Sequence, residues 1–574
     1  MAKTVAQVLV DVLAQYGVQR VYGLPGDSLN GITDAIRMHG GIQFVHVRHE
    51  EVAAFAAGAE AQLTGQLAVC AGSCGPGNTH LINGLYDCNR SRVPVLAIAA
   101  QIPSEEVGSS YFQETHPERT FVDCSVYVEV ISHPSQVPRI FEIAIQTALA
   151  KSGVAVIVIP GDVALEPAIQ TKPRILAKEF GSATRPSESA LRVAADILNE
   201  GHVVTILAGA GCAGAHAEVM DAAEKLKAPI VHSTRGKDVI EYDNPYDCGL
   251  TGLIGFSSGY HALKACDTLL MLGTDFPYQQ FYPENAKVVQ LDLRLEQIGR
   301  RTPVHGALVG DVGETLRLLL PLLQEKVDRK HLDQAVDHYG RVRKQLDDLA
   351  TGEPGHTPIH PQYLTRLIDE LAADDAIFTF DVGTLTIWAS RYLRMNGRRR
   401  LIGSFNHGSM ANALPQAIGL QAAAPKRQVI TLSGDGGVSM LMGDLITLRQ
   451  MQLPVKVVVF ANGSLAFVEL EMKAAGFVNF GTDLWKADFA KIAEGSGILG
   501  LRVEDPADLR GALSTAFAHD GPALVEVAVA RQELSFPPTI TIEQAKGFGL
   551  WSIRTVLSGR GDELIDLART NLWR

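Results

Sequence analysis

Short runs of β-branched and aliphatic residues alternate with longer segments of helical spacing along most of the chain. In the first part these runs lie at 21–22, 44–47, 67–70, 95–99 and 154–159. A second block has runs at 203–208, 230–231, 268–273 and 288–293, and a third has runs at 376–380, 428–433, 455–461 and 523–529. Strands that alternate with helices form parallel, doubly wound sheets. We therefore expect three α/β domains, each built on a doubly wound parallel sheet.

Polar segments separate the three blocks. Pro167, Pro173 and Pro186 indicate a linker after the first block. A highly charged segment at 325–348, for which we expect a helix, precedes the third block. These positions place the domains at 1–182, 183–336 and 337–532, followed by a tail of a different kind at 533–574. The length of 574 residues would accommodate roughly four domains of about 150 residues, so three domains and an appendage account for it.

The tail has the residue spacing expected of an amphipathic helix. Leu564, Leu567 and Leu572 fall on one helical face, and charged side chains lie on the other. Two of the four tryptophans in the chain, Trp551 and Trp573, belong to this tail. A helix of this kind either docks on its own subunit or a partner, or lies in a lipid interface. The sequence alone leaves both possibilities open.

Composition and charge narrow the classes of function. Lysine and arginine number 51 and aspartate and glutamate 63, which gives a net charge of −12. A protein that binds nucleic acid needs a basic surface for the phosphates, so we expect no nucleic-acid partner. No apolar run is long enough to span a bilayer. Seven cysteines without a Cys-x-x-Cys pair favour a reduced, cytoplasmic chain in which they are small core residues.

Candidate metal ligands follow two neighbouring predicted strands of the third block. Gly434-Asp435-Gly436 comes directly after the run at 428–433, and Asn462 follows the run at 455–461. One strand–helix–strand unit, with a helix expected over 438–450, would bring both to the same edge of a sheet. A carboxylate, an amide oxygen and a pyrophosphate make an oxygen-only site suited to Mg²⁺. Gly-Asp-Gly alone is usually a turn, but the paired spacing is more specific.

Other candidates have ordinary structural explanations when each is taken alone. Glu50 precedes a helix expected over 53–64, where the helix dipole favours an acidic residue. Met410 follows two small residues, and a methionine in such a setting usually fills a gap in the core. Phe112 and Phe467 are isolated aromatic residues of the kind that usually pack in a core.

Taken together, these motifs resemble those of thiamine diphosphate (ThDP) enzymes. Gly434-Asp435-Gly436 followed by Asn462 is similar to the diphosphate and Mg²⁺ motif of that family, although Ala461 stands where relatives usually have a first asparagine. The resemblance implies that Asp435, Asn462 and the main-chain carbonyl of Ser464 bind Mg²⁺. It implies a hydrogen bond from Glu50 to N1′ of the cofactor and a bent cofactor held by Met410. The implied ThDP-binding residues are Glu50, Gly408, Ser409, Met410, Asp435, Gly436, Gly437, Asn462 and Phe467.

Longer segments narrow the resemblance to the quinone-reducing pyruvate oxidases of bacteria. These segments lie at 22–29, 48–64, 111–117 and 403–415, and the likeness extends over essentially the whole chain. In the middle block it implies an FAD site made of Thr251, Gly252, Leu253, Ile254, Thr274, Asp275, Phe276, Pro277, Tyr278 and Asp292. Phe467 would be a mobile residue that aids electron transfer to the flavin, and Phe112 would pack near it. Both join Glu50 as expected catalytic residues. Relatives have a glycine just before the position of Phe467, where this chain has Ala466.

The resemblance also implies an activity and partners. Pyruvate would be oxidatively decarboxylated to acetate and CO₂, with electrons passed through FAD to ubiquinone or menaquinone. The tail would cover the active site at rest and move to membrane phospholipid on activation. We therefore expect a cytoplasmic protein that is peripheral on the inner face of the cell membrane. A homo-oligomer of at least two subunits is implied, with a tetramer favoured. The alternatives are a non-redox carboligase of the acetolactate synthase type, a phosphate-dependent pyruvate oxidase and a catalytically silent regulatory subunit.

Overall fold

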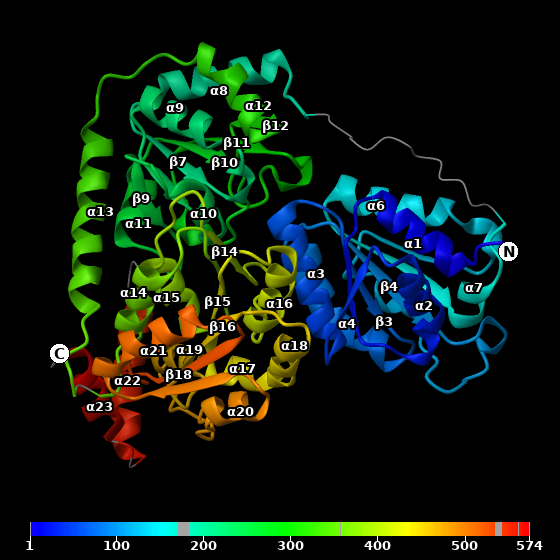
Figure 1. The fold of residues 1–574 in the computed structure, drawn as a ribbon. Coiled ribbons are helices and arrows are strands. Elements are labelled where there is room, and N and C mark those ends of the chain that lie inside the picture. Colours follow the sequence, from blue (N-terminus) through cyan, green and yellow to red (C-terminus); the bar gives the residue numbers. More distant parts are fainter. Residues whose placement is uncertain are drawn as a thin grey trace.

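Three six-stranded sheets, in which every strand pair is parallel, organise the molecule (Figure 1). The computed structural model describes residues 2–169, 183–355, 357–533, 542–558, 560 and 562–572. The expected fold class of three doubly wound α/β units is therefore confirmed. Part of the predicted linker, including Pro173, lies outside the described residues, as does Trp573.

The first sheet has the strand order β2-β1-β3-β4-β6-β5. Its strands are β1 (Arg20–Gly23), β2 (Gln43–His46), β3 (Ala68–Gly72), β4 (Val95–Gln101), β5 (Tyr127–Val130) and β6 (Val154–Pro160). The main helices are α1 (Val5–Gln15), α2 (Asn30–His39), α3 (Glu50–Thr64), α4 (Pro76–Arg90) and α6 (Arg139–Lys151). Successive β3 residues, such as Ala68 and Val69, belong to different core clusters. Both faces of this sheet are therefore buried, as a parallel sheet requires.

The middle sheet has the order β12-β11-β10-β7-β8-β9. Its strands are β7 (Val204–Ala208), β8 (Ile230–His232), β9 (Asp247–Leu250), β10 (Thr268–Leu272), β11 (Lys287–Asp292) and β12 (Gly306–Val309). Its helices include α8 (Glu188–Glu200), α9 (His216–Leu226), α10 (Lys237–Ile240), α11 (Ser257–Ala265) and α12 (Val312–Leu319). The charged segment forms the expected helix, α13 (Lys330–Leu349), which packs on α11 and β9. The proposed boundary between residues 336 and 337 falls within this helix.

The third sheet has the order β14-β13-β15-β16-β18-β17. Its strands are β13 (Ile377–Phe380), β14 (Arg400–Gly403), β15 (Val429–Gly434), β16 (Lys456–Ala461), β17 (Leu499–Val503) and β18 (Ala523–Ala528). Its helices include α14 (Pro361–Leu371), α15 (Thr384–Tyr392), α16 (Ala413–Ala423), α19 (Ala466–Ala474), α20 (Phe489–Gly495) and α21 (Pro506–Ala518). The helical stretch expected over 438–450 is present, but a 3₁₀ turn at Met442–Asp444 divides it into α17 (Asp435–Leu441) and α18 (Leu445–Gln450).

Helices α3 and α16 join the first and third domains. The alanines of α3, including Ala53, Ala56 and Ala57, are fully buried, and they share a core cluster with Ala417 and Ile418 of α16. Small side chains allow two helices to approach closely over their whole length. The two domains therefore share one apolar core within a single chain.

The described part of the tail consists of two helices, α22 (Ile542–Leu557) and α23 (Asp562–Leu572), which lie beside the third domain (Figure 1). Helix α22 packs against α19, and Trp551 is fully buried there. No helix in the described ranges is long and apolar enough to cross a membrane. All seven cysteines are free and buried, which confirms the prediction that they are small core residues.

Candidate active site

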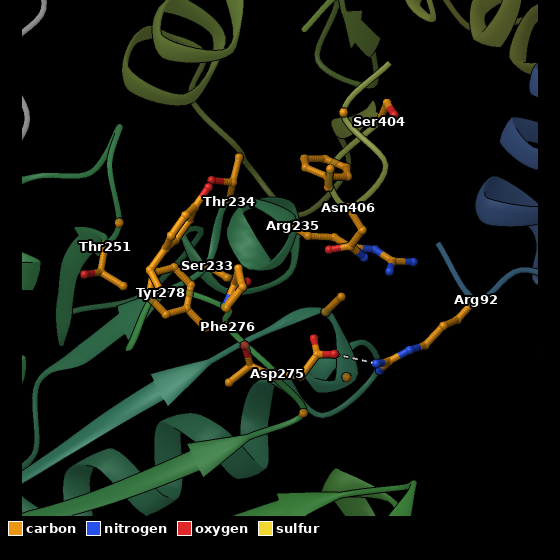
Figure 2. Close-up of a pocket in the computed structure, with 18 of the residues that line it drawn as sticks. Arg92, Ser233, Thr234, Arg235, Thr251, Asp275, Phe276, Tyr278, Ser404 and Asn406 are labelled. Carbon is orange, nitrogen blue, oxygen red and sulfur yellow. Dashed lines mark hydrogen bonds and ion pairs between the residues drawn. The ribbon is translucent and has the colours of Figure 1, made fainter. Parts of the chain in front are cut away.

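A cavity of about 560 Å³ lies where the middle domain faces the other two domains (Figure 2). Every middle-domain residue expected at an FAD site lines it, from Thr251 to Ile254, from Thr274 to Tyr278, and Asp292. The first domain contributes Arg92 and Ser152, and the third contributes Phe380, Val382, Gly383, Thr386, Ser404, Phe405, Asn406, Gly408, Phe467 and Glu471. The cavity is thus an interdomain cleft of the size in which small ligands bind.

The ends of parallel strands position the middle-domain wall. Thr251 directly follows β9, Gly273 follows β10, and Asp292 ends β11, so all three lie at the carboxyl edge of the sheet. Ligands of open α/β sheets bind at this edge. A Cβ on Gly211 would lie 2.6 Å from the Cα of Gly273, so the turn after β7 can approach the turn after β10 only as glycine. Because the two turns lie so close together, Gly211 and Gly273 form a continuous part of the cavity wall.

Basic side chains give the cavity an anion-binding character. The Arg92 guanidinium lies 2.6 Å from a carboxylate oxygen of Asp275 (Figure 2). Burial lowers the pKa of Arg235 to about 10, and burial also lowers the pKa of Arg294. Both remain cationic near neutral pH. Guanidinium groups that converge on a cleft favour a phosphate-bearing ligand.

Two polar side chains of the cavity have features that suit a ligand. Burial raises the pKa of Asp292, whose Oδ1 accepts a hydrogen bond from the backbone N–H of Arg294 at 2.9 Å. The Oγ1 atom of Thr251 is buried and has no hydrogen-bond partner among the described residues. A buried hydroxyl without a partner is costly, and a ligand that fills the cavity could satisfy it.

The candidate metal ligands lie together at the carboxyl edge of the third sheet. Strands β15 and β16 pair in parallel with Gly434 opposite Phe460, which places Asp435 and Asn462 side by side. The Asp435 carboxylate accepts hydrogen bonds from the N–H groups of Gly463 at 2.6 Å and Gly436 at 2.9 Å. Burial raises the pKa of Asp435, although these donors oppose the shift. The predicted juxtaposition of a carboxylate and an amide is therefore present.

Glycines keep this site open. A Cβ on Gly437 would lie 2.3 Å from Oδ2 of Asp381, so no side chain fits there. A Cβ on Gly436 would lie 3.5 Å from Cε of Met410, which places Met410 beside the Asp435 turn. In the described part of the chain no group of three His, Cys, Asp or Glu side chains could hold a metal. A metal at Asp435 would therefore be held by one carboxylate together with amide and carbonyl oxygens.

The segment 408–410 connects the metal site with the cavity. Gly408 lines the cavity, whereas Ser409 Oγ accepts a hydrogen bond from the Asn83 side chain at 3.0 Å. Asn83 also donates to Glu51 at 2.7 Å. The structure thus brings the neighbour of Glu50 close to the segment that carries Met410.

Glu50 begins α3 and is buried, with 3% of its surface exposed. His49 caps the helix, and His80 Nδ1 lies 2.9 Å from a Glu50 carboxylate oxygen. The hydrogen-bonding partner of the Glu50 carboxylate belongs to the first domain, and those of Asp435 belong to the third. The two carboxylates therefore share none of these hydrogen-bond partners.

The two aromatic candidates have different positions. Phe467 lies in the first turn of α19 and lines the cavity. Phe112 is 77% exposed and is not among the residues that line the cavity. Its expected place beside a flavin stays a prediction.

Several cavity residues were not predicted from the sequence. Arg235 follows β8 in a short 3₁₀ turn, and its position after a strand could have suggested a ligand contact. Glu471 lies one helical turn after Phe467, so that their side chains share a face of α19. Arg92 comes from the first domain, and nothing in its local sequence points to the cavity.

Comparisons with known proteins agree with this architecture. Residues 3–120 match the family model for the N-terminal TPP binding domain of thiamine pyrophosphate enzymes, 191–319 match the central domain, and 381–527 match the C-terminal TPP binding domain. The chain therefore belongs to the thiamine pyrophosphate (ThDP) enzyme family.

Three relatives cover nearly the whole chain. The putative thiamine pyrophosphate-containing protein YdaP of Bacillus subtilis is 37% identical over 570 residues, covering 99% of each chain. A pyruvate oxidase of Lactiplantibacillus plantarum is 30% identical and covers 91% of this chain and 88% of its own. The large subunit of acetolactate synthase isozyme 1 of Escherichia coli is 29% identical, with coverages of 93% and 95%.

Proposed function

We propose that this protein is a ThDP- and FAD-dependent pyruvate:quinone oxidoreductase. The reaction is pyruvate, quinone and water giving acetate, CO₂ and quinol. The observation that carries the proposal is the interdomain cavity, because every expected FAD residue lines it and because Phe467 and Gly408 of the ThDP-binding domain line it too. A redox cofactor in this cavity would therefore lie next to the site where pyruvate reacts.

The third domain supplies the groups that would hold the diphosphate through Mg²⁺. Asp435 and Asn462 offer side-chain oxygens at adjacent strand ends, and Ser464 offers its main-chain carbonyl. Hard oxygen ligands of this kind suit Mg²⁺. Ala461 leaves the Asn462 position intact, so we expect metal binding despite the missing first asparagine. Met410, beside Gly436, would press on the bound cofactor from one side.

The middle domain would hold FAD. Arg92, Arg235 and Arg294 suit its diphosphate, Asp292 suits a ribose hydroxyl, and the unpartnered Thr251 hydroxyl can donate to it. When bound, ThDP supplies a nucleophilic carbon for the keto group of pyruvate, and FAD accepts two electrons. Phe467 lines the cavity from the first turn of α19, and Glu50 would form a hydrogen bond with N1′ of bound ThDP.

Activity requires at least a dimer under this proposal. Within one chain the Glu50 and Asp435 carboxylates have different hydrogen-bond partners, and by resemblance to ThDP enzymes the two residues would serve the same cofactor from different subunits. We expect a homo-oligomer, with a tetramer favoured. Sedimentation of the purified protein measures this directly, and a catalytically active monomer would refute it.

The tail would bring the protein to the membrane, where quinone could reoxidise the reduced flavin. Helix α22 exposes 60% of Ile553 and 81% of Leu557, while Trp551 is buried against the third domain. We propose that the tail docks at rest and moves to phospholipid at the inner face of the cell membrane, where ubiquinone or menaquinone accepts the electrons. Deletion of the residues after Gly549 should abolish liposome binding, and unchanged binding would exclude this role.

A non-redox carboligase is the second candidate, because acetolactate synthase relatives match nearly the whole chain. A phosphate-dependent oxidase is a third. The deciding experiment adds pyruvate and inorganic phosphate to the protein loaded with ThDP, Mg²⁺ and FAD under anaerobic conditions. The oxidase proposal predicts bleaching of the flavin absorption, followed by acetate as product. Unchanged flavin absorption with acetolactate as product would identify a carboligase, and acetyl phosphate would identify the phosphate-dependent enzyme.

A further inference from the structure

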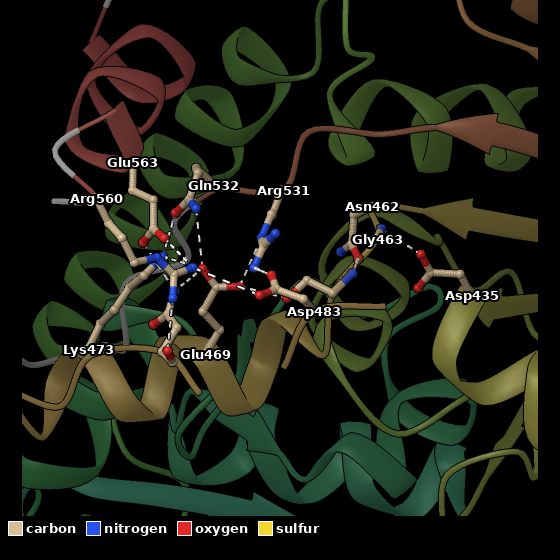
Figure 3. Close-up of polar contacts among 12 residues, drawn as sticks. Asp435, Asn462, Gly463, Glu469, Lys473, Asp483, Arg531, Gln532, Arg560 and Glu563 are labelled. Atoms are coloured by element: carbon tan, nitrogen blue, oxygen red, sulfur yellow. Dashed lines mark hydrogen bonds and ion pairs between the residues drawn. The ribbon is translucent and has the colours of Figure 1, made fainter. Parts of the chain in front are cut away.

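A buried carboxylate on α19 collects hydrogen bonds from the metal-site loop, the end of the third domain and a neighbouring loop (Figure 3). Glu469 is 1% exposed. Its Oε2 accepts from Ser464 Oγ at 2.6 Å and Arg531 at 3.1 Å. Its Oε1 accepts from Asn479 at 2.6 Å and Gln532 at 3.2 Å and pairs with Lys473 at 2.9 Å. Both oxygens are thus saturated with donors.

The bond from Ser464 connects Glu469 to the metal-site loop itself. The backbone N–H of Ser464 donates to Asn462 Oδ1 at 3.0 Å, and the next peptide, at Leu465, donates to Thr482 O at 2.9 Å. On the other side, Gly463 N–H donates to Asp435. The Ser464 hydroxyl bond therefore fixes the loop from the side opposite Asp435.

The same carboxylate is also linked to the tail. Asn479, which donates to Glu469, lies 3.2 Å from a carboxylate oxygen of Glu563 in α23. Lys473 lies 5.0 Å from the centre of the Trp551 ring. The Glu469 side chain is therefore held on several sides and has little freedom to rotate.

The neighbouring positive charges favour the ionised form of the Glu469 carboxylate. Burial would raise the pKa of Glu469, but Lys473, Ser464 and Arg531 together hold it below the usual value. A buried carboxylate is stable only when it is paired and hydrogen-bonded, and a bond from a hydroxyl to a charged acceptor is stronger than a neutral one. The Ser464–Glu469 bond is accordingly a firm constraint on the loop.

We propose that Glu469 is a positioning residue for the metal site. Through the Ser464 hydroxyl it sets the backbone of 462–464, so that the Asn462 side-chain oxygen and the Ser464 carbonyl face the same point as Asp435. This inference rests on the proposed Mg²⁺ site. It assigns a role to Glu469 that none of the sequence motifs indicated.

The test measures binding, in the full-length protein freed of cofactor. Mg²⁺ is titrated at a fixed concentration of ThDP, and calorimetry gives its affinity. Ser464→Ala removes the hydroxyl but keeps the main-chain carbonyl, and Glu469→Gln keeps the shape but removes the charge. Each should weaken Mg²⁺ binding about ten- to hundredfold, as loss of an outer-shell partner does. The double variant should be no weaker than the weaker single variant, because both break the same link. Glu494→Gln, at an exposed position of α20, is the matched control and should bind as wild type does.

The possible results distinguish failure of the proposed Mg²⁺ site from failure of the proposed role of Glu469. Failure of the wild-type protein to bind Mg²⁺ with ThDP overturns the proposed site and this inference together. Wild-type binding with unchanged affinity in Ser464→Ala overturns the inference alone, as do additive losses in the double variant. If Glu469→Gln fails to fold, because Lys473 and Arg531 lose their counter-charge, Ser464→Ala still decides, since it leaves the charge network intact.

Discussion

Trp551 is the largest fully buried side chain of the described tail, and its removal should weaken the docking of the tail. Trp551 is fully buried, its ring centre lies 5.0 Å from that of Phe548, and Lys473 lies over its ring at 5.0 Å. Truncation of a buried tryptophan to alanine costs about 3 to 5 kcal/mol, and loss of the cation–π contact adds about 0.5 to 2 kcal/mol. Even the lower limit of 3 kcal/mol raises the undocked population about a hundredfold.

Limited trypsin digestion measures that population. In the docked tail two of the trypsin sites are engaged, because Arg554 donates to Gly476 O at 2.7 Å and Arg560 donates to Asn479 O at 2.9 Å. When opening is fast, the rate of cleavage follows the population of the open form. Trp551→Ala should therefore be cleaved after Arg554 and Arg560 about a hundredfold faster than wild type, at the lower limit of the cost.

Two matched variants make this result interpretable. Trp485→Ala removes a tryptophan that is 93% exposed and should leave cleavage of the tail unchanged. Trp551→Phe keeps an aromatic ring and should give an intermediate rate. Equal cleavage of Trp551→Ala and wild type, or equal acceleration by Trp485→Ala, would refute the view that Trp551 anchors the tail.

Three further predictions concern the cofactor sites and an interdomain carboxylate. Asp435→Asn places an amide donor where backbone N–H groups now donate, so Mg²⁺ affinity should fall at least a hundredfold by calorimetry; near wild-type affinity would contradict the metal assignment. Gly211→Ala drives a methyl group to 2.6 Å from the Cα of Gly273, so the purified protein should retain less flavin per chain, as measured by absorbance. Burial raises the pKa of Asp87 to about 6, so the folded state holds this proton more tightly than the unfolded state, and the contribution of Asp87 to stability decreases as the pH rises from about 4 to about 6. Asp87→Asn removes this dependence, so between pH 4 and pH 7 its free energy of unfolding should rise by about 2 to 3 kcal/mol relative to wild type in urea titrations; a constant difference would contradict it.

The strands that hydrophobic patterning did not predict were missed for one physical reason. Every predicted run falls on a strand, whereas β5, β9, β12, β14 and β17 had no predicted counterpart, and each lies at the edge of its sheet. Central strands of a parallel sheet are buried on both faces and therefore appear as continuous apolar runs. Edge strands pair on one side only and tolerate polar residues and glycine, as in Tyr127–Val130 and Asp247–Leu250. Hydrophobic patterning thus locates every interior strand but only one edge strand, β2, which matches the run at 44–47.

The residues of the cofactor sites also fall into two groups, those that the sequence could predict and those that it could not. Asp435 and Asn462 could be predicted because the strand–helix–strand topology brings the ends of consecutive strands together. Arg92 and Phe467 meet at one cavity only because three domains pack against one another, and no spacing within one domain encodes that meeting. The FAD segments were identified by resemblance, since loops after strands have no chemistry of their own that distinguishes them.

Glu469 shows why the remaining contacts are hidden in the sequence. Its position in α19 looks like that of any acidic residue on a helix surface, and Lys473 four residues later resembles an ordinary helical ion pair. It is buried only because the chain after β18 returns over α19 with Arg531 and Gln532, and because the tail then covers Lys473 with Trp551. A surface ion pair contributes little to stability, but covering it removes water and makes each partner costly to lose. The tail therefore changes the energetic importance of a residue that also holds the metal-site loop, and the two functions of the third domain cannot be altered independently at this position.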